Sequence, residues 1–169
     1  MKFEIDVSGY DMFNDTYVIC LSGDDGEIIR GFKFNKELVN NLINNWKSNQ
    51  YRYKYTPSES KRGIFKVRIY CIIIYYILKY IISAQKIDFI SLTICRDFKG
   101  RENEITQSLK YFLESLLKIK VGKPLYQQLP ASSNAHRYSR MMRIDTKNRL
   151  NTYVGIHLKD IEIFLKKRK

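Results

Sequence analysis

The sequence predicts an α/β fold whose mixed sheet begins with a three-stranded antiparallel meander and is flanked by helices. Residues 2–9 alternate between apolar and polar side chains, the two-residue period of a strand with one buried face. Residues 17–21 and 27–34 are rich in β-formers, and the glycine- and aspartate-rich turn at 22–26 joins them as a hairpin. Helical and strand-like patterns then follow one another, which is typical of α/β domains.

Each later element has its own signal. Asn35 is a predicted N-cap, and apolar residues recur at helical spacing as far as Trp46. Residues 64–83 are the most apolar stretch and could be a membrane span or a buried helix; because Lys79 interrupts them, we expect a buried helix and no membrane span. The remaining patterns predict a strand at 87–95, a helix at 101–118, a short strand at 123–130, a basic helix within 131–149 and a docking helix at 156–169 with a basic end.

Composition indicates the class of protein and the class of partner. The 169 residues are 44% apolar and include only 3 Pro and 8 Gly, which predicts one ordered domain spanning residues 1–169. Lys and Arg number 30 against 17 Asp and Glu, giving a net charge of +13. This charge favours a nucleic-acid partner over the alternatives of a ribosome-associated or membrane-surface protein.

The cysteines and the N-terminus indicate the compartment. Cys20, Cys71 and Cys95 are widely spaced in apolar runs and lack the spacing of a zinc site, so we expect buried thiols in a reducing environment. No secretory signal is visible where the strand pattern starts, at residue 2, so the expected location is cytoplasmic. The presence of only two histidines excludes a histidine-rich metal site.

Two segments are candidates for nucleic-acid contacts. If residues 51–55 are extended, tyrosines that could stack on bases face one side and cations that could meet phosphates face the other. The alternative is an edge strand whose tyrosines pack inward and whose charges discourage aggregation. Cations also recur every three or four residues between 137 and 147, and on a helix they form one basic stripe suited to phosphates. The predicted nucleic-acid-binding residues are Tyr51, Arg52, Tyr53, Lys54, Tyr55, Arg137, Arg140, Arg143 and Lys147.

Carboxylates near strand ends are candidates for a metal site. Asp6 lies on the polar face of the first strand, and Asp97 follows the strand at 87–95, at the edge where α/β sheets usually form their sites. Each has a structural alternative, since both aspartates could simply end their strands. Likewise, Asp145 could pair with Arg149, and Glu102 could stabilise the first turn of its helix through the helix dipole.

The motifs Ile5-Asp6-Val7-Ser8-Gly9 and Ile94-Cys95-Arg96-Asp97 resemble the ribonuclease H-like superfamily. That family begins with a β-meander whose first strand carries an acid, places a second acid after the fourth strand and takes a further acid from a late helix. Segment 133–145 shows a faint resemblance to the helix of type 2 ribonuclease H, which begins with small residues, carries a basic residue midway and ends in Arg and then Asp. The resemblance therefore implies a ribonuclease H-like mixed sheet over most of the chain.

The resemblance also implies a site that holds Mg²⁺ or Mn²⁺. It implies Asp6, Asp97 and Asp145 as catalytic residues and metal ligands, with Glu102 as a further ligand and Glu4 as a spare. The sequence departs from the family at two places. Valine follows Asp6 where type 2 ribonuclease H has a glutamate, and residues 64–83 contain no acid, so Glu102 or the acid at position 59 would have to complete the set.

The resulting prediction is a nucleic-acid-binding protein that cleaves phosphodiesters by a two-metal mechanism. One alternative is a non-catalytic nucleic-acid-binding module on the same fold. A second alternative is an interaction protein that dimerises through the apolar helix at 64–83.

Overall fold

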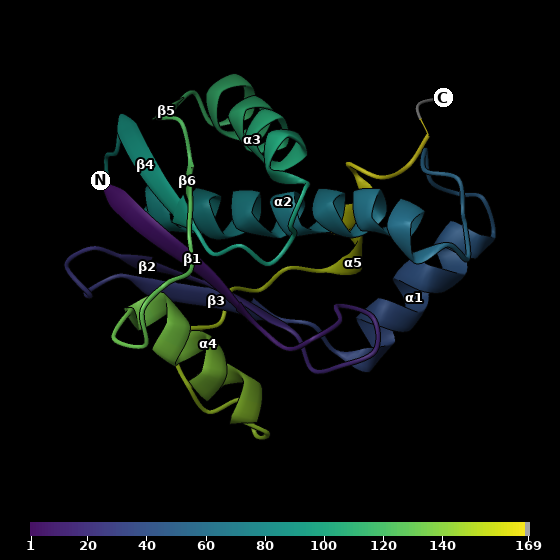
Figure 1. The fold of residues 1–169 in the computed structure, drawn as a ribbon, viewed down its shortest axis with the longest axis horizontal. Coiled ribbons are helices and arrows are strands. Elements are labelled where there is room, and N and C mark those ends of the chain that lie inside the picture. The colour runs from purple at the N-terminus through teal and green to yellow at the C-terminus, as the bar shows by residue number, and fades with distance from the viewer. Residues whose placement is uncertain (168–169) are drawn as a thin grey trace.

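A mixed six-stranded sheet flanked by helices forms the body of the protein (Figure 1). The computed structural model describes residues 1–167, without the side chains of residues 59–61. The predicted antiparallel meander is present, and the next strand pairs in parallel with the first. The order is β3-β2-β1-β4-β5, with β6 also on β4. The strands are β1 (Lys2–Ser8), β2 (Val18–Gly23), β3 (Ile29–Lys33), β4 (Phe89–Ile94), β5 (Lys120–Val121) and β6 (Leu125–Tyr126).

The helices differ from the sequence expectations mainly at their ends. The helix expected at 101–118 consists of an α-helix followed by a π-helical turn, and the expected short strand at 123–130 is replaced by two strands of two residues each. The expected tail helix is much shorter, and residues 168–169 of its basic end lie outside the described residues. The helices are α1 (Lys36–Lys47), α2 (Glu59–Ser83), α3 (Glu102–Lys110), η1 (Tyr111–Leu116), α4 (Asn134–Ile144) and α5 (Leu158–Glu162).

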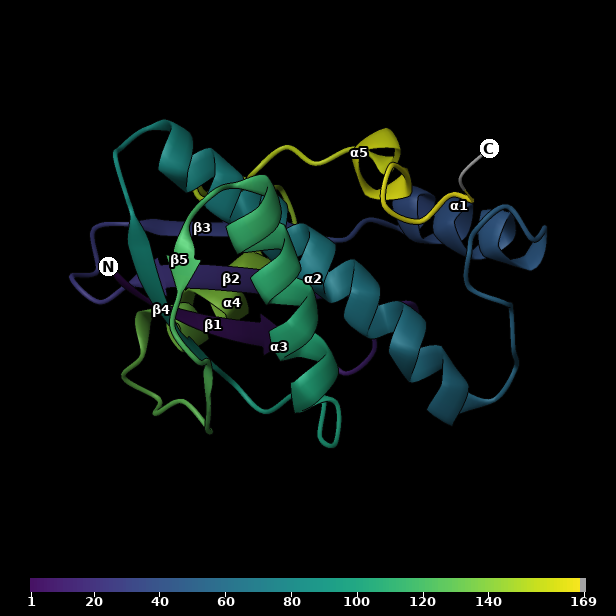
Figure 2. The same ribbon diagram turned by 90° about the horizontal axis from the view of Figure 1, so that it is seen from above.

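The two faces of the sheet are covered by different helices. Along β1, Phe3 and Ile5 belong to the large core that contains α2, whereas Asp6 contacts α4 on the opposite face. On β2, Val18 and Cys20 likewise join a small core beneath α4. Figure 2 shows α2 and α3 stacked over the sheet with α4 beyond it. The strand alternation therefore places the polar side chains of β1 under α4.

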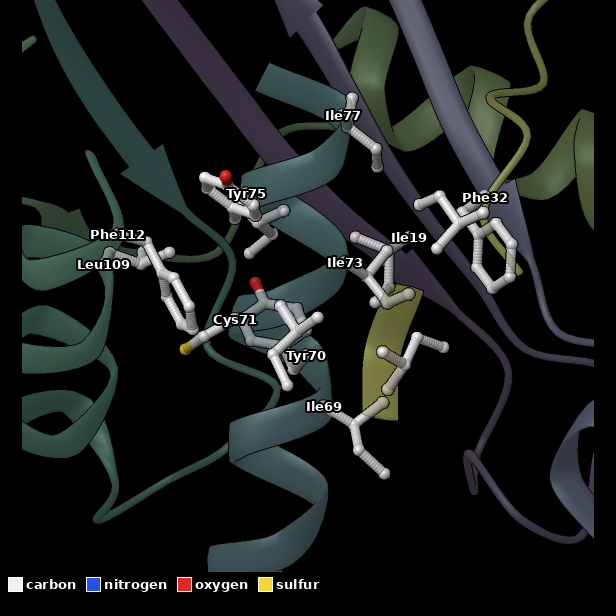
Figure 3. Packing of buried hydrophobic residues seen from close by; sticks show 14 of the residues in the cluster. Ile19, Phe32, Ile69, Tyr70, Cys71, Ile73, Tyr75, Ile77, Leu109 and Phe112 are labelled. Atoms are coloured by element: carbon white, nitrogen blue, oxygen red, sulfur yellow. The ribbon is translucent and has the colours of Figure 1, made fainter. Parts of the chain in front are cut away.

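Helix α2 is buried on nearly all sides, as expected from its apolar sequence. Figure 3 shows Ile73 beside Ile19 and Phe32 of the sheet, and Tyr75 on the side of Phe112. The Tyr75 and Phe112 rings lie 5.3 Å apart. Because its own chain covers this apolar surface, α2 does not offer it for the dimerisation that the sequence left open. No helix in the described part of the chain has the length and hydropathy needed to cross a bilayer.

Glycine at position 31 lets α4 approach the sheet closely. A Cβ added there would lie 2.7 Å from Met142 Sδ and 2.9 Å from the Ile19 carbonyl oxygen, and the latter is backbone that cannot easily move. We expect Gly31→Ala to lower the free energy of unfolding by about 1–3 kcal/mol through overpacking, measured by urea denaturation. Gly155→Ala is the matched control, because an added Cβ there meets nothing within 4 Å. Equal stabilities for the two variants would contradict this packing.

Candidate functional site

Two predicted acids and a cysteine meet at the carboxyl ends of β1 and β4. These strands are parallel neighbours, with Ile5 opposite Ile94, and the Cys95 N–H donates to the Ile5 carbonyl at 2.9 Å. Asp6, Cys95 and Asp97 each bring one candidate ligand atom to within 4.8 Å of the other two. The structure therefore brings Asp6 and Asp97 together as the sequence suggested, and it adds the Cys95 thiol to the same group.

Burial and mutual repulsion dominate the electrostatics of this cluster. Asp6 is 3% exposed. Asp97 is exposed as a residue, but the surrounding chain shields its carboxyl group from water. This desolvation, and after it the negative charge of Asp6, raises the pKa of Asp97 to about 7. Burial likewise raises the pKa of the Cys95 thiol to about 11. Two carboxylates this close favour either a proton or a cation between them.

The first turn of α4 is attached to the polar face of β1. His136 Nδ1 lies 2.8 Å from Asp6 Oδ2, and the Ser139 hydroxyl donates to the same oxygen at 3.4 Å. The N-cap residue Ser133 donates to Glu4 Oε2 at 2.6 Å. Acids are favourable beside a helix N-terminus because the backbone N–H groups and the helix dipole point toward them. These contacts hold α4 directly over the Asp6 cluster.

Asp145 and Glu102 do not join this cluster. Asp145 ends α4, where its carboxylate accepts hydrogen bonds from the backbone of Arg149 and Leu150 and from the Tyr153 hydroxyl. The hydroxyl contact, followed by the Leu150 N–H, lowers the pKa of Asp145. Glu102 begins α3, where its carbonyl accepts from Tyr126. The structure therefore does not support the metal-ligand role that the resemblance implies for these two residues. Other contacts hold the Asp145 carboxylate. Glu102 lies outside the one candidate ligand group found among the described residues.

The basic stripe on α4 borders a hollow of about 350 Å³ beside His136. Arg137, Arg140 and Arg143 line it, and no ion pair joins them to a carboxylate within the described residues. The buried Nε of Arg143 finds no hydrogen-bond partner among those residues either. Lys147 lies beyond the end of α4 and is exposed. Three arginines that form no ion pair within the described part of the chain therefore line a hollow together with His136, which contacts Asp6.

The segment 51–55 adopts the inward-packed arrangement. Tyr51 is 0% exposed and forms a bridge with Lys166, so it cannot stack on a base, contrary to its predicted role. Tyr53 and Tyr55 are half-buried beside the core, while Arg52 and Lys54 remain exposed. The Arg52 guanidinium donates to the Phe164 carbonyl at 2.7 Å. The tyrosines face inward because the segment follows α1 and must cover Trp46 and its neighbours.

Sequence reasoning overlooked His136 and Cys95. His136 has no role among the sequence predictions, and Cys95, predicted to be a buried thiol, is partly exposed. One usable signal was the spacing Ser133, His136, Ser139, which places three polar side chains on one face of a helix. A polar stripe on a face that must pack against a sheet indicates hydrogen-bonding partners on that sheet.

The donor atoms of the cluster fit a divalent metal ion. Carboxylate oxygens of Asp6 and Asp97 suit Mg²⁺ or Mn²⁺, the ions that the resemblance implies. The Cys95 sulfur is a softer donor that Mg²⁺ does not use, so this set favours Mn²⁺ over Mg²⁺. The buried Asp6 carboxylate, paired with a second one, supports the fit, because without a cation the two would repel.

Comparison with models of known protein families, with characterised proteins and with solved structures finds no match to this chain.

The raised pKa of Asp97 gives a pH-dependent prediction. A carboxyl group whose pKa rises from 3.8 to about 7 on folding stabilises the protein when protonated. That contribution is complete below the ordinary value and is lost as pH rises through the raised one. With metal chelated, we expect the melting temperature of Asp97→Asn to exceed that of the wild type more at about pH 8 than at about pH 5. A pH-independent difference would contradict the raised pKa of Asp97.

Proposed function

We propose that the protein binds nucleic acid along α4 and cleaves its phosphodiester backbone at the Asp6 cluster with divalent metal ions. The observation that carries this proposal is the arginine-lined hollow, whose lining includes His136, the residue with Nδ1 2.8 Å from Oδ2 of the buried Asp6. Guanidinium groups without protein anions are suited to phosphates, and adjacent carboxylates are suited to the metal ions that phosphodiester chemistry uses. The net charge of +13 supports a polyanionic partner.

The neighbourhood of the acids supports a ribonuclease H-like arrangement. The chain begins with an antiparallel meander that carries Asp6 on its first strand, and Asp97 follows the fourth strand beside it. These are two of the positions implied by the resemblance. The resemblance also implies an acid on the late helix, but the residue of α4 that contacts Asp6 is His136.

In the proposed mechanism the chain's own residues have separate tasks. Asp6, Cys95 and Asp97 would hold the metal, which when bound would supply activation of water and stabilisation of the leaving oxygen. His136, whose Nδ1 lies 2.8 Å from Asp6 Oδ2, fixes the orientation of Asp6 and also lines the hollow. The arginines of α4 bind phosphates and set the position of the backbone.

A specific observation also supports a second candidate, binding without cleavage. Among the described residues the candidate ligand group contains two carboxylates and one thiol, rather than three or four carboxylates. Such a site would hold fewer hard ligands than two Mg²⁺ ions usually require. On this alternative the arginine surface binds nucleic acid while the acid cluster serves only to anchor α4.

One experiment separates the two candidates. The protein is incubated with labelled single-stranded DNA, branched DNA and RNA–DNA hybrid, with Mn²⁺, with Mg²⁺ or with chelator, while anisotropy reports binding and gel electrophoresis reports cleavage. Cleavage that requires metal and is faster with Mn²⁺ supports the nuclease. Binding that is unaffected by metal, without products, supports the binding module. Absence of salt-sensitive binding to every substrate would contradict both.

A further inference from the structure

An aromatic pocket is lined by residues of α1, of the start of α2 and of the segment that joins them. Figures 1 and 2 show that α1 lies apart from α4. It has a volume of about 430 Å³, within the range of small-ligand pockets. Trp46 and Phe65 form its floor, with stacked rings whose centroids lie 4.2 Å apart. Tyr53 and Tyr55 form its walls and are half-buried, so each keeps part of a ring open to a ligand.

The walls of the pocket are held by contacts within the chain. Trp46 Nε1 donates to the Tyr53 carbonyl at 3.0 Å, and the Trp46 and Tyr55 rings meet edge to face with centroids 4.9 Å apart. Arg62 donates to the Tyr55 hydroxyl at 3.0 Å. The rings are therefore held in place before any ligand arrives, which lowers the entropic cost of stacking against them.

The charge around the pocket is positive. Lys54 is exposed in its lining, and Lys47 and Arg62 each lie 5.7 Å from the centre of the Tyr55 ring. The lining residues include no carboxylate among the side chains that the structure describes. A flat aromatic group attached to an anion complements such a site, since π faces stack on the rings and the anion meets the lysines.

We propose that this pocket takes one unpaired nucleobase of a bound strand, with the adjoining phosphate near Lys54. This inference rests on the proposed nucleic-acid binding and specifies its substrate class: a strand with at least one base free of pairing. A paired base cannot enter because its face is covered by its neighbours in the stack. Of the three tyrosines in segment 51–55 that were predicted to stack on bases, Tyr53 and Tyr55 line this pocket, whereas Tyr51 is part of the core.

The test uses Trp46, the only tryptophan of the chain, as a fluorescent reporter in the pocket. The full chain is titrated with a labelled single-stranded oligonucleotide and with an abasic strand of equal length, so that label anisotropy reports binding and Trp46 reports the pocket. We expect both strands to bind but only the strand with bases to change Trp46 fluorescence. A Trp46 response to the abasic strand, or binding of the base-containing strand without one, would overturn the inference.

Variants test which rings matter. Tyr53→Leu and Tyr55→Leu should weaken single-strand binding by about 5- to 150-fold each, the usual range for loss of one stacking ring, and should leave abasic-strand binding unchanged. Tyr53→Phe keeps the ring and leaves the Arg62–Tyr55 hydrogen bond in place, so it should bind as the wild type does. Tyr111→Leu, which removes a surface ring on η1, is the matched control. Circular dichroism checks that each variant is folded, and equal losses for both strands would overturn the inference.

The two proposals fail in different ways. If neither strand binds by anisotropy, the proposed nucleic-acid function is wrong and the base pocket with it. If both strands bind and Trp46 is silent, only the base pocket is wrong. If a short apolar peptide changes Trp46 fluorescence and the base-containing strand does not, the pocket serves a protein partner and the inference is overturned.

Discussion

Asp6→Asn is expected to remove metal-dependent cleavage while leaving nucleic-acid binding nearly unchanged. The amide is isosteric and its oxygen can still accept from His136 Nδ1, so the anchor of α4 is kept. The substitution removes the negative charge with which Asp6, together with Asp97, would bind a cation. Because changes in the surroundings of a metal ligand already cost 10- to 100-fold, we expect the loss of a ligand charge to slow cleavage by about 100-fold or more. Initial rates with Mn²⁺ at saturating substrate measure the effect.

Asp145→Asn is the matched control for this result. It removes the same charge from a residue that hydrogen bonds to Arg149, Leu150 and Tyr153 rather than to the cluster. We expect this variant to lose some stability and to keep its cleavage rate per folded molecule. The resemblance to type 2 ribonuclease H implies the opposite. Loss of cleavage in a folded Asp145→Asn protein, or wild-type cleavage by Asp6→Asn, would overturn the assignment of the site.

The second large effect is expected when the arginines of α4 are replaced. Arg137→Gln combined with Arg140→Gln should weaken binding by roughly tenfold for each residue, the value of a charged hydrogen bond. If each arginine meets one phosphate, the slope of log affinity against log salt concentration should also fall by about 2. Arg143 is left in place because its Nε is buried, so replacing it could disturb the packing of α4. Anisotropy titrations over a range of salt concentrations measure both quantities.

The control for the arginines removes equal charge elsewhere. Lys86 and Lys110 are exposed and lie outside α4, so Lys86→Gln combined with Lys110→Gln lowers the net charge by the same amount. We expect this protein to bind with nearly the wild-type salt dependence. If it loses as much affinity as the arginine variant, binding depends on overall charge and the hollow beside His136 has no special part in it.

Local patterns in the sequence were sufficient for the main helices and strands and for part of the site. The alternation of residues 2–9 predicted β1 and identified Asp6 as a polar residue on one face. The acid after the strand at 87–95 predicted Asp97 near it, because the ends of parallel neighbours meet at one edge. The cationic spacing from residue 137 predicted the arginine face of α4. Each of these depends on a period or a spacing within a short stretch of chain.

Contacts between distant segments decided the rest. The resemblance to type 2 ribonuclease H implied that Asp145 would join the cluster, yet the first turn of α4, and not its last, lies beside Asp6. The orientation of a helix on a sheet depends on packing, here the close approach at Gly31 and the anchor at Glu4, and no periodicity encodes it. The same applies to Tyr51, which is buried because the tail of the chain pairs with it.

The sequence by itself determined the α/β class, the antiparallel meander, the buried helix α2 and the basic surface of α4, because these follow from hydrophobic periodicity and charge along the chain. Only the tertiary structure decided which polar groups meet. In the structure, Cys95 and His136 lie beside Asp6, and Asp145 lies outside that cluster. Two tyrosines of segment 51–55 line a pocket. The physical reason is that a side chain's chemistry is local, whereas its neighbours are fixed by how whole elements pack.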